Sequence, residues 1–354
     1  MSLSVTEPKN GKVRAVGMLS GGLDSTLATK IMLDQGIDVL GLNFYTGFCV
    51  TEQQRRVGRQ KAGNKPPRNE ALRAGADLEV PIEIMDIAED YREVVLHPKH
   101  GYGANMNPCV DCRAFMLGKA REYMIEVGAQ FVFTGEVLGQ RPKSQHRAQL
   151  GIVAREAGLE GYLLRPLSAK LLDPTIPEQK GWVNRDLLES IHGRSREGQM
   201  QLAEKFGVTD YPPPAGGCCY LADPNYARKF RDLLGHRETR DYSPDDAILL
   251  GLGRHFRLSP VVKVVVGRDK NENEVLARMK DGRIALAIEG VPGPFSLVEG
   301  PATAVEIELA SRLAARYADR DGDRPVAVAY SGAVSSGTLE VLALSDEEVQ
   351  KLRV

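Results

Sequence analysis

Short apolar runs alternate with amphipathic stretches through the first half of the chain. The runs have the length of buried strands and occupy residues 13–19, 37–44, 78–84 and 130–134, with a further candidate at 162–166. Between them, residues 24–35 and 112–127 have helical spacing of apolar side chains, among them Leu23, Leu27, Ile31, Phe115, Ala120, Tyr123 and Met124. This strand–helix–strand alternation predicts a parallel sheet that helices cover on both faces, which is the α/β class.

The pattern changes toward the second half. Residues 184–191 and 196–206 carry helix signals, and segment 211–217 follows them with three consecutive prolines and two glycines. Farther on, residues 261–267, 283–288 and 325–330 are β-like, and a long helix is predicted at 302–317. We expect three parts: a parallel-sheet domain at 1–172, a helical, cysteine-bearing extension at 173–240 that completes the active site, and a smaller α+β domain at 241–354.

A strongly basic stretch, residues 51–75, lies between the second and third predicted strands. Seven lysines and arginines stand against two glutamates, for a net charge of +5. Gly58, Gly63, Pro66 and Pro67 favour a mobile loop. Such a run is either a solvated surface insertion or a contact for phosphate groups near an active site.

Composition narrows the classes of protein to consider. Among 354 residues, Lys and Arg number 46 and Asp and Glu 47, so the net charge of −1 excludes a histone-like polycation. Any RNA contact must come from local clusters of basic side chains. Five cysteines, an odd and low number, argue against a secreted disulfide framework. The chain opens without an apolar leader and has no charge-free window of 18 residues, so we expect a cytoplasmic protein without membrane spans.

A glycine-rich loop carries the most specific chemistry. Residues 16–25 read Val-Gly-Met-Leu-Ser-Gly-Gly-Leu-Asp-Ser and join the first predicted strand to the first predicted helix. The two adjacent glycines permit a tight turn, and the amides of the turn and of the helix start form an anion cradle. The hydroxyls of Ser20 and Ser25 add donors, and Asp24 can hold Mg²⁺ against a phosphate. The segment lacks the lysine of the ordinary GxxxxGK[ST] loop.

Three cysteines stand where they can serve chemistry. Cys109 and Cys112 form a CxxC pair at the start of the second predicted helix, where the helix dipole stabilises thiolates. Such a pair can be a metal-ligand pair, a redox pair or a nucleophile. Cys218 directly follows Gly-Gly, which favours it over Cys219 as a third thiol, whereas Cys49 is expected to be buried. Three thiolates are too few for a closed Cys₄ zinc site, but they suit a [4Fe–4S] cluster with one open iron.

The glycine-rich loop resembles the SGGxDS signature of the PP-loop ATP pyrophosphatases, which cleave ATP to AMP and pyrophosphate and have an adenine nucleotide α-hydrolase-like fold. Residues 107–112, Asn-Pro-Cys-Val-Asp-Cys, are similar to the NPxxxC region of tRNA 2-thiouridylases in this family, with Cys112 at the place of the catalytic cysteine. The CxxC form resembles the iron–sulfur-dependent members, and residues 214–218 resemble the region of the second cysteine. Residues 133–136, Phe-Thr-Gly-Glu, match the turn that lines the nucleotide site.

The resemblance to tRNA thiouridine synthetases covers about residues 12–235 and ends there. The THUMP domain of 4-thiouridine synthases and the β-barrel tail of 2-thiouridylases are not recognisable in the sequence, so the target nucleotide stays open. Residues 253–256 and 266–269 instead resemble an NFACT-type, RNA-associated module.

The resemblance implies ATP-dependent replacement of a uridine carbonyl oxygen in tRNA by sulfur. It assigns catalysis to Asp24, Cys109, Cys112 and Cys218. It assigns the binding of ATP and Mg²⁺ to Met18, Ser20, Gly21, Gly22, Asp24, Ser25, Thr134 and Gly135. Asn43 is a further candidate for the ribose of ATP, because it follows the second predicted strand and open α/β sheets bind ligands at that edge; ordinary loop capping is the alternative. The resemblance assigns a [4Fe–4S] cluster, with zinc as the alternative, to Cys109, Cys112 and Cys218. The sulfur donor would be sulfide or a persulfide carrier, and a homodimer is left open.

Two other functions stay open at this point. One is a small-molecule synthetase that adenylates a carboxylate and holds structural zinc with its cysteines. The other is an RNA-binding adaptor without catalysis, which the intact Asp24 and Ser25 argue against. Several lone side chains allow either an RNA or phosphate contact or a plain surface role: His100, Arg141, Lys143, His146, Arg147, Trp182, Arg194 and Arg196.

Overall fold

The computed structural model describes residues 5, 7–8, 11–56, 68–141, 144–213, 219–320, 322, 324–333 and 335–354. The chain divides into two compact units. The first comprises Met1–Thr46 and Arg68–Cys218, and the second comprises Gly47–Pro67 and Cys219–Val354. The chain therefore crosses between the units three times. Residues 173–218 group with the first unit, and the expected division into domains after residues 172 and 240 stays a prediction.

The first unit is built on a parallel sheet of five strands in the order β3-β2-β1-β4-β5. Its strands are β1 (Arg14–Met18), β2 (Asp38–Tyr45), β3 (Ile82–Asp86), β4 (Phe131–Thr134) and β5 (Leu163–Leu164). Its helices are α1 (Leu23–Asp34), α3 (Glu70–Asp77), α4 (Tyr91–Leu96), α5 (Cys109–Glu126), α6 (Arg147–Glu156), α7 (Ile176–Gln179) and α8 (Glu197–Lys205), with short 3₁₀ turns η2 (Ala169–Leu171) and η3 (Arg185–Leu187). The predicted parallel α/β architecture is confirmed.

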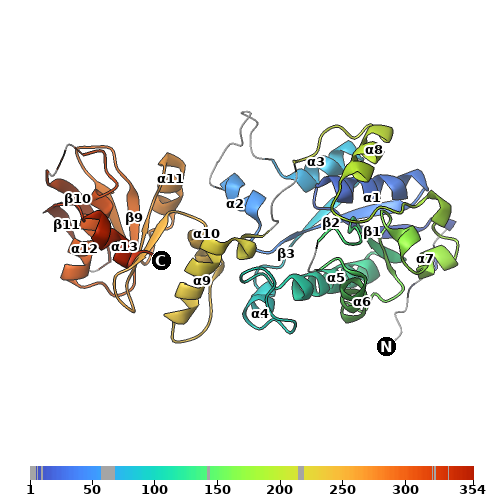
Figure 1. Ribbon diagram of the computed structural model, residues 1–354, viewed down its shortest axis with the longest axis horizontal. Coiled ribbons are helices and arrows are strands. Elements are labelled where there is room, and N and C mark those ends of the chain that lie inside the picture. Colours follow the sequence, from blue (N-terminus) through green and yellow to red (C-terminus); the bar gives the residue numbers. More distant parts are fainter. Residues whose placement is uncertain are drawn as a thin grey trace. The chain divides into compact units, whose positions relative to one another are not determined.

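Helices bury both faces of this sheet, as Figure 1 shows. On one face, Leu27 of α1 and Leu202 of α8 share a core with Phe133 of β4. On the other face, Leu117 of α5 shares a core with Val132 of β4 and with apolar residues of α6. Successive strand residues point to opposite faces, so β1 and β4 must be apolar almost throughout. This explains the continuous apolar runs from which the strands are predicted.

Two boundaries lie three or more residues from the predicted ones, and one predicted helix does not form. The second helix of the pattern begins at Cys109 rather than at residue 112, so the whole CxxC pair lies in its first turn. The third strand begins at Ile82 rather than at residue 78, because Leu78 caps helix α3. The helix expected at 184–191 is wrong. Only turn η3 forms there, because backbone amides of this segment bond to the carbonyls of residues 166 and 167.

The second unit contains an antiparallel sheet of six strands in the order β11-β10-β8-β9-β7-β6. Its strands are β6 (Arg254–Arg257), β7 (Lys263–Val266), β8 (Ile284–Ile288), β9 (Phe295–Glu299), β10 (Val326–Ser331) and β11 (Ser336–Val341). Its helices are α2 (Val50–Arg56), α9 (Pro224–Gly235), α10 (Pro244–Leu250), α11 (Lys270–Arg278), α12 (Ala304–Ala315) and α13 (Asp346–Leu352), with turn η4 (Tyr220–Ala222). A smaller α+β part is therefore confirmed, and α12 is the long helix expected there. None of the helices in the described part of the chain has the length and apolarity needed to cross a membrane.

The prediction of a mobile loop over residues 51–75 is wrong in part. Both ends of this stretch are helical and belong to α2 and α3. The side chain of Asn69 caps the first turn of α3. Residues 57–67 lie outside the described residues. Arginines at the two ends are paired with acidic residues, as Arg55–Glu52, Arg68–Asp210 and Arg73–Glu70. These carboxylates already match the arginine charges, which weakens the case for a phosphate contact at the ends of the stretch.

An aromatic cluster attaches the start of α2 to α9 and α10. Phe48 precedes α2 and is fully buried. Its ring centroid lies 6.1 Å from that of Tyr226, 5.9 Å from that of Phe230 and 5.5 Å from that of Tyr242. Gln53 of α2 donates from Nε2 to a backbone carbonyl of α10 at 2.7 Å. These contacts explain why this segment belongs to the second unit, where Figure 1 shows α2 beside α10.

Replacing Phe48 with Ala tests this assignment. We expect the second unit to lose about 3–5 kcal/mol of unfolding free energy, because truncating a fully buried Phe leaves a cavity. Amide hydrogen exchange followed by mass spectrometry should become faster in α9 and α10 but not in β1 or β4. Val305, whose side chain is 76% exposed, supplies a control, since Val305→Ala should leave exchange unchanged. Faster exchange confined to the first unit would contradict the assignment.

Candidate functional site

The glycine-rich loop and the turn after β4 lie together at the carboxyl edge of the parallel sheet. β1 and β4 are neighbours with Met18 opposite Thr134, so both strands end at the same level. The strand order reverses here, because β2 and β3 extend to one side of β1 while β4 and β5 extend to the other. Open α/β sheets bind ligands at such a switch point. This edge thus brings together eight of the expected nucleotide-binding residues: Met18, Ser20, Gly21, Gly22, Asp24, Ser25, Thr134 and Gly135.

Two backbone contacts fix the position of the loop. Gly21 has a φ of +75°, and a Cβ added there would lie 2.1 Å from the backbone carbon of Glu70. A Cβ added at Gly135 would lie 2.5 Å from the backbone of Asp24 and Ser25. Neither clash could be relieved by rotating a side chain, because backbone meets backbone in both. The loop is therefore held between the start of α3 and the turn after β4.

Hydrogen bonds inside the loop hold its conformation. Ser25 Oγ donates to the carbonyl of Gly22 at 2.9 Å and lies 3.2 Å from Ser20 Oγ. From the neighbouring strand β2, Asn43 Nδ2 donates to the carbonyl of Leu19 at 2.8 Å. Asn43 thus positions the loop, while its contact with a nucleotide stays a prediction. Helix α1 is described along its whole length, and no side chain caps its amino end. The amides of its first turn are therefore left to bind an anion at the loop, where the helix dipole also favours negative charge.

Asp24 presents a carboxylate oxygen for which the described part of the chain supplies no hydrogen-bond donor. Its Oδ2 accepts from Gln140 Nε2 at 3.0 Å, while Oδ1 is buried without a donor among the described residues. A buried polar atom left in this state is destabilising unless a ligand satisfies it. Mg²⁺ takes carboxylate oxygens together with substrate phosphates. The unsatisfied oxygen therefore fits a Mg²⁺ ion held against a nucleotide phosphate.

Glu136 is a buried carboxylate clamped by two arginines. Its Oε2 accepts from Arg165 Nε at 3.0 Å, and its Oε1 lies 3.2 Å from Arg113 Nε. Thr134 Oγ1 also donates to Oε2, at 3.2 Å. Burial alone would raise the pKa of Glu136, but the two arginines and Thr134 outweigh it and hold the pKa below its ordinary value. The charged carboxylate fixes the turn that carries Gly135.

The CxxC thiols are joined to this turn through their neighbour in the sequence. Cys109 and Cys112 lie one turn apart at the amino end of α5, and both residues are half-buried. Arg113 follows Cys112 and reaches Glu136, so the first turn of α5 is connected to the turn that carries Gly135. Cys218 lies outside the described residues. Within the described ranges, no three His, Cys, Asp or Glu residues gather to hold a metal, and the cluster or zinc site stays a prediction.

Sequence reasoning missed the side chains that support the site. These are Arg113 and Arg165 at Glu136, Gln140 at Asp24, and Arg73, whose Nη2 donates to the carbonyl of Gly21 at 3.2 Å. The sequence indicated Arg73 only as a member of the basic stretch. The other three carry no local signal, because each has its partner in a distant part of the chain.

Three of the eight lone side chains that were considered for RNA or phosphate have partners within the chain. These are His100 with Glu156, Arg147 with the carbonyl of Leu171, and Trp182 with Lys180. Lys143 lies outside the described residues. RNA contacts by Arg141, His146, Arg194 and Arg196 stay predictions.

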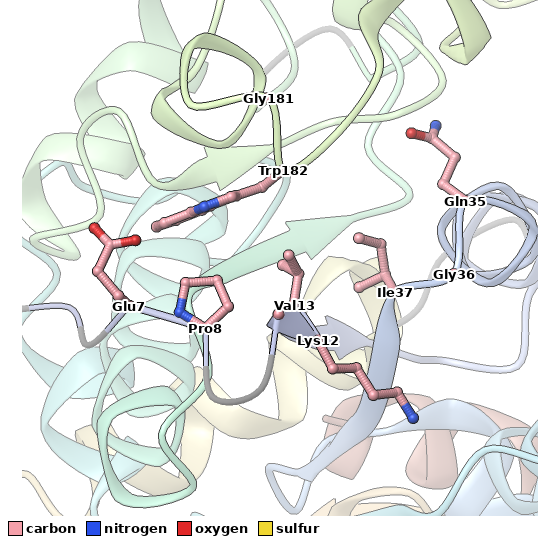
Figure 2. Close-up of a pocket in the computed structure, with 10 residues that line it drawn as sticks. Glu7, Pro8, Lys12, Val13, Gln35, Gly36, Ile37, Gly181 and Trp182 are labelled. Carbon is pink, nitrogen blue, oxygen red and sulfur yellow. The ribbon is translucent and has the colours of Figure 1, made fainter.

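A pocket of about 620 Å³ lies at the opposite edge of the sheet. It is lined by residues that precede β1 and β2, among them Val13 and Ile37. Figure 2 shows the indole of Trp182 on one side of the pocket and Pro8 and Val13 on the other. Ligands of open α/β sheets bind at the carboxyl edge, so this pocket is not expected to hold the nucleotide.

Two family models match the two sheets. Residues 13–179 match the tRNA methyl transferase HUP domain, a range that contains the parallel sheet and the glycine-rich loop. Residues 253–353 match the NFACT protein RNA binding domain, a range that contains the antiparallel sheet.

Curated proteins similar to this chain include tRNA-specific 2-thiouridylases. The 2-thiouridylase MnmA of Caldicellulosiruptor saccharolyticus is 22% identical over 293 residues, which cover 79% of this chain and 76% of that protein. MnmA of Bartonella quintana is 32% identical over 152 residues, which cover 40% of this chain and 35% of that protein.

A solved 4-thiouridine synthetase–RNA complex with bound ATP is similar over 55% of this chain and 52% of that chain, with 19% identity and a TM-score of 0.30. The C-terminal part of the fibronectin/fibrinogen-binding protein of Streptococcus suis matches 69% of this chain and 96% of that chain, with 13% identity and a TM-score of 0.26. At TM-scores this low, the structural likeness adds nothing to the sequence matches.

Replacing Glu136 with Gln tests the clamp on the turn. We expect the first unit to lose about 3–5 kcal/mol of unfolding free energy near neutral pH, because two arginines lose their shared carboxylate. The pKa of Glu136 is lowered in the folded protein, so its stabilisation is complete above the unfolded pKa and is lost as pH falls through the folded pKa. Urea unfolding followed from neutral pH into this acid range should therefore show a flatter pH dependence in the variant.

Glu156→Gln is the matched control, because Glu156 pairs with Lys99 and His100 at the surface. Its loss should stay below about 1 kcal/mol. Equal losses in the two variants would contradict a buried clamp at Glu136.

Proposed function

We propose that the chain is a PP-loop tRNA thiouridylase, which uses ATP to replace a uridine carbonyl oxygen of tRNA with sulfur. One observation carries the proposal: the buried Asp24 oxygen that has no donor among the described residues, beside an intact glycine-rich loop at the switch point of the sheet. The match of residues 253–353 to an RNA-binding domain supports an RNA substrate.

In the first step, the loop binds the ATP phosphates and activates the uridine. The loop amides and the hydroxyl of Ser20 would donate to the phosphates, while Ser25 Oγ, which donates to the carbonyl of Gly22, holds the loop in shape. Mg²⁺ bound at Asp24 would supply further stabilisation of phosphate charge. The uridine carbonyl oxygen attacks the α-phosphorus, the bond to the β-phosphate oxygen breaks, and pyrophosphate leaves. The uridine oxygen then carries AMP, and the loop amides stabilise the charge that develops during the attack.

In the second step, sulfur replaces the activated oxygen. A persulfide on Cys112 attacks the uridine carbon through its terminal sulfur, and AMP leaves with the former carbonyl oxygen. A second thiolate, that of Cys218 or Cys109, then attacks the remaining sulfur of Cys112. This releases the thiolated uridine and leaves a disulfide, which an external dithiol reduces. A persulfide donor then transfers a new sulfur atom to the Cys112 thiol.

A [4Fe–4S] cluster is the other route that the three cysteines suggest. The described residues supply two thiols at the start of α5, whereas such a cluster needs three. This donor set does not by itself fit a cluster, so no step is assigned to one. Iron and acid-labile sulfide in protein purified without oxygen would favour the cluster, and thiolation by iron-free protein would favour the persulfide.

Replacing Asp24 with Asn keeps the shape of the side chain and removes its charge. We expect tRNA-dependent pyrophosphate release to fall about a hundredfold or more, because stabilisation of the phosphate charge is lost. The measurement is pyrophosphate release across a range of Mg²⁺ concentrations. Asp34→Asn, at the other end of α1 where Asp34 pairs with Lys30, is the control. Unchanged release in the Asp24 variant would contradict its role, and release that needs a small carboxylate but no tRNA would support a small-molecule synthetase.

Replacing Cys112 with Ser separates activation from sulfur transfer. We expect ATP cleavage with tRNA to continue while thiolated uridine disappears, because a serine hydroxyl cannot carry a persulfide. Mass spectrometry of tRNA nucleosides and assay of AMP measure the two steps. Under reducing conditions Cys49→Ser serves as the control and should retain both. If the Cys112 variant still thiolates tRNA, this cysteine does not carry the sulfur.

A further inference from the structure

Cys49 and Cys219 face each other in the second unit, although they are far apart in the sequence. They are paired in an isolated antiparallel β-bridge. The amide of Tyr220 donates to the carbonyl of Phe48 at 3.0 Å, so the hydrogen bonding of this bridge runs through the residues beside the cysteines. The cysteines are therefore a non-hydrogen-bonded pair, in which Cα atoms lie about 4.5 Å apart. This separation falls within the range of about 4.4–6.8 Å that a disulfide requires.

The backbone on both sides of the bridge is anchored to one aromatic cluster. Phe48 is fully buried against Tyr226, Phe230 and Tyr242. Tyr220 stacks on Tyr226 with ring centroids 5.2 Å apart. Because the neighbours of both cysteines contact the same ring, the bridge cannot open without unpacking this core. The fold itself thus holds the backbones of the two cysteines next to each other.

Both cysteines are also within reach of small molecules. Cys49, expected to be buried, is only half-buried, and so is Cys219. We propose that Cys49 and Cys219 form a reversible dithiol–disulfide site that takes small-molecule disulfides as its oxidising substrate. This proposal does not depend on the thiolation reaction, since it rests on the second unit alone.

The exchange is balanced in atoms and electrons. One cysteine thiolate attacks a sulfur of the small disulfide, a mixed disulfide forms, and one small thiolate leaves. The second cysteine thiolate attacks the mixed disulfide at the protein sulfur, and the second small thiolate leaves. The protein dithiol is oxidised by two electrons, the small disulfide is reduced to two thiols, and the cysteine protons pass to them.

The site lies where the chain passes between its two units. Gly47 and Cys219 are the first residues of the second unit at two of the three crossings. A Cys49–Cys219 disulfide would therefore join these crossings covalently and close a loop that contains most of the first unit. The disulfide would also give the two adjacent cysteines separate roles. Cys219 would belong to this pair, and Cys218 would remain the predicted third thiol beside Cys109 and Cys112.

In the test, the full chain is equilibrated without oxygen in buffers of reduced and oxidised glutathione. Thiol exchange is then quenched with acid, and the remaining thiols are blocked. Protease digestion and mass spectrometry then identify linked peptides. Cys218 and Cys219 fall in one tryptic peptide, so the assignment uses single Ser variants of each. We expect a dithiothreitol-reversible link to the Cys49 peptide in the wild type and in Cys218→Ser, and its loss in Cys219→Ser.

The wild-type result needs no variant to fold, and circular dichroism checks the two variants. A link that persists in Cys219→Ser and disappears in Cys218→Ser would overturn the proposal by assigning the partner to Cys218. Glutathione adducts on Cys49 and Cys219 without an intramolecular link would overturn it as well. A higher melting temperature of the oxidised wild type, absent from Cys219→Ser, would support it by a second measurement.

Discussion

The close approach of Gly135 to the backbone of Asp24 and Ser25 is the constraint on which the candidate site depends. No side chain fits between these segments, so the end of β4 and the start of α1 must meet backbone to backbone. Gly21 imposes the same condition on the other side of the loop, against Glu70. Because rigid elements hold the loop from both sides, its amides are oriented before a ligand binds. Oriented dipoles of this kind stabilise charge most effectively during a reaction.

The turn after β4 also connects the glycine-rich loop to the CxxC pair. Glu136 follows Gly135 and is fixed by Arg165 and by Arg113, and Arg113 follows Cys112. One buried carboxylate thus connects the first turn of α5 to the loop that would hold the phosphates. The proposed reaction needs this connection, because the sulfur must reach a carbon whose oxygen is already bonded to phosphorus.

Patterns along the chain predict the features that neighbouring residues determine. Apolar runs and adjacent glycines identify the parallel sheet and its first loop, because burial and tight turns are set within a few residues. The same patterns do not identify the partners of Glu136 or the pairing of Cys49 with Cys219, which depend on contacts between distant segments. The helix expected at 184–191 fails for the same reason, since its amides bond to residues 166 and 167 instead.

The most direct test of the proposed chemistry follows the uridine oxygen. tRNA made with a heavy oxygen isotope at both uridine carbonyls is incubated with ATP, Mg²⁺ and a persulfide donor, and the AMP formed is analysed by mass spectrometry. If the uridine oxygen attacks the α-phosphorus, AMP carries one heavy oxygen for each thiolated uridine formed. AMP without the heavy oxygen, at the same yield of thiolated uridine, would contradict the claim that the loop activates the base.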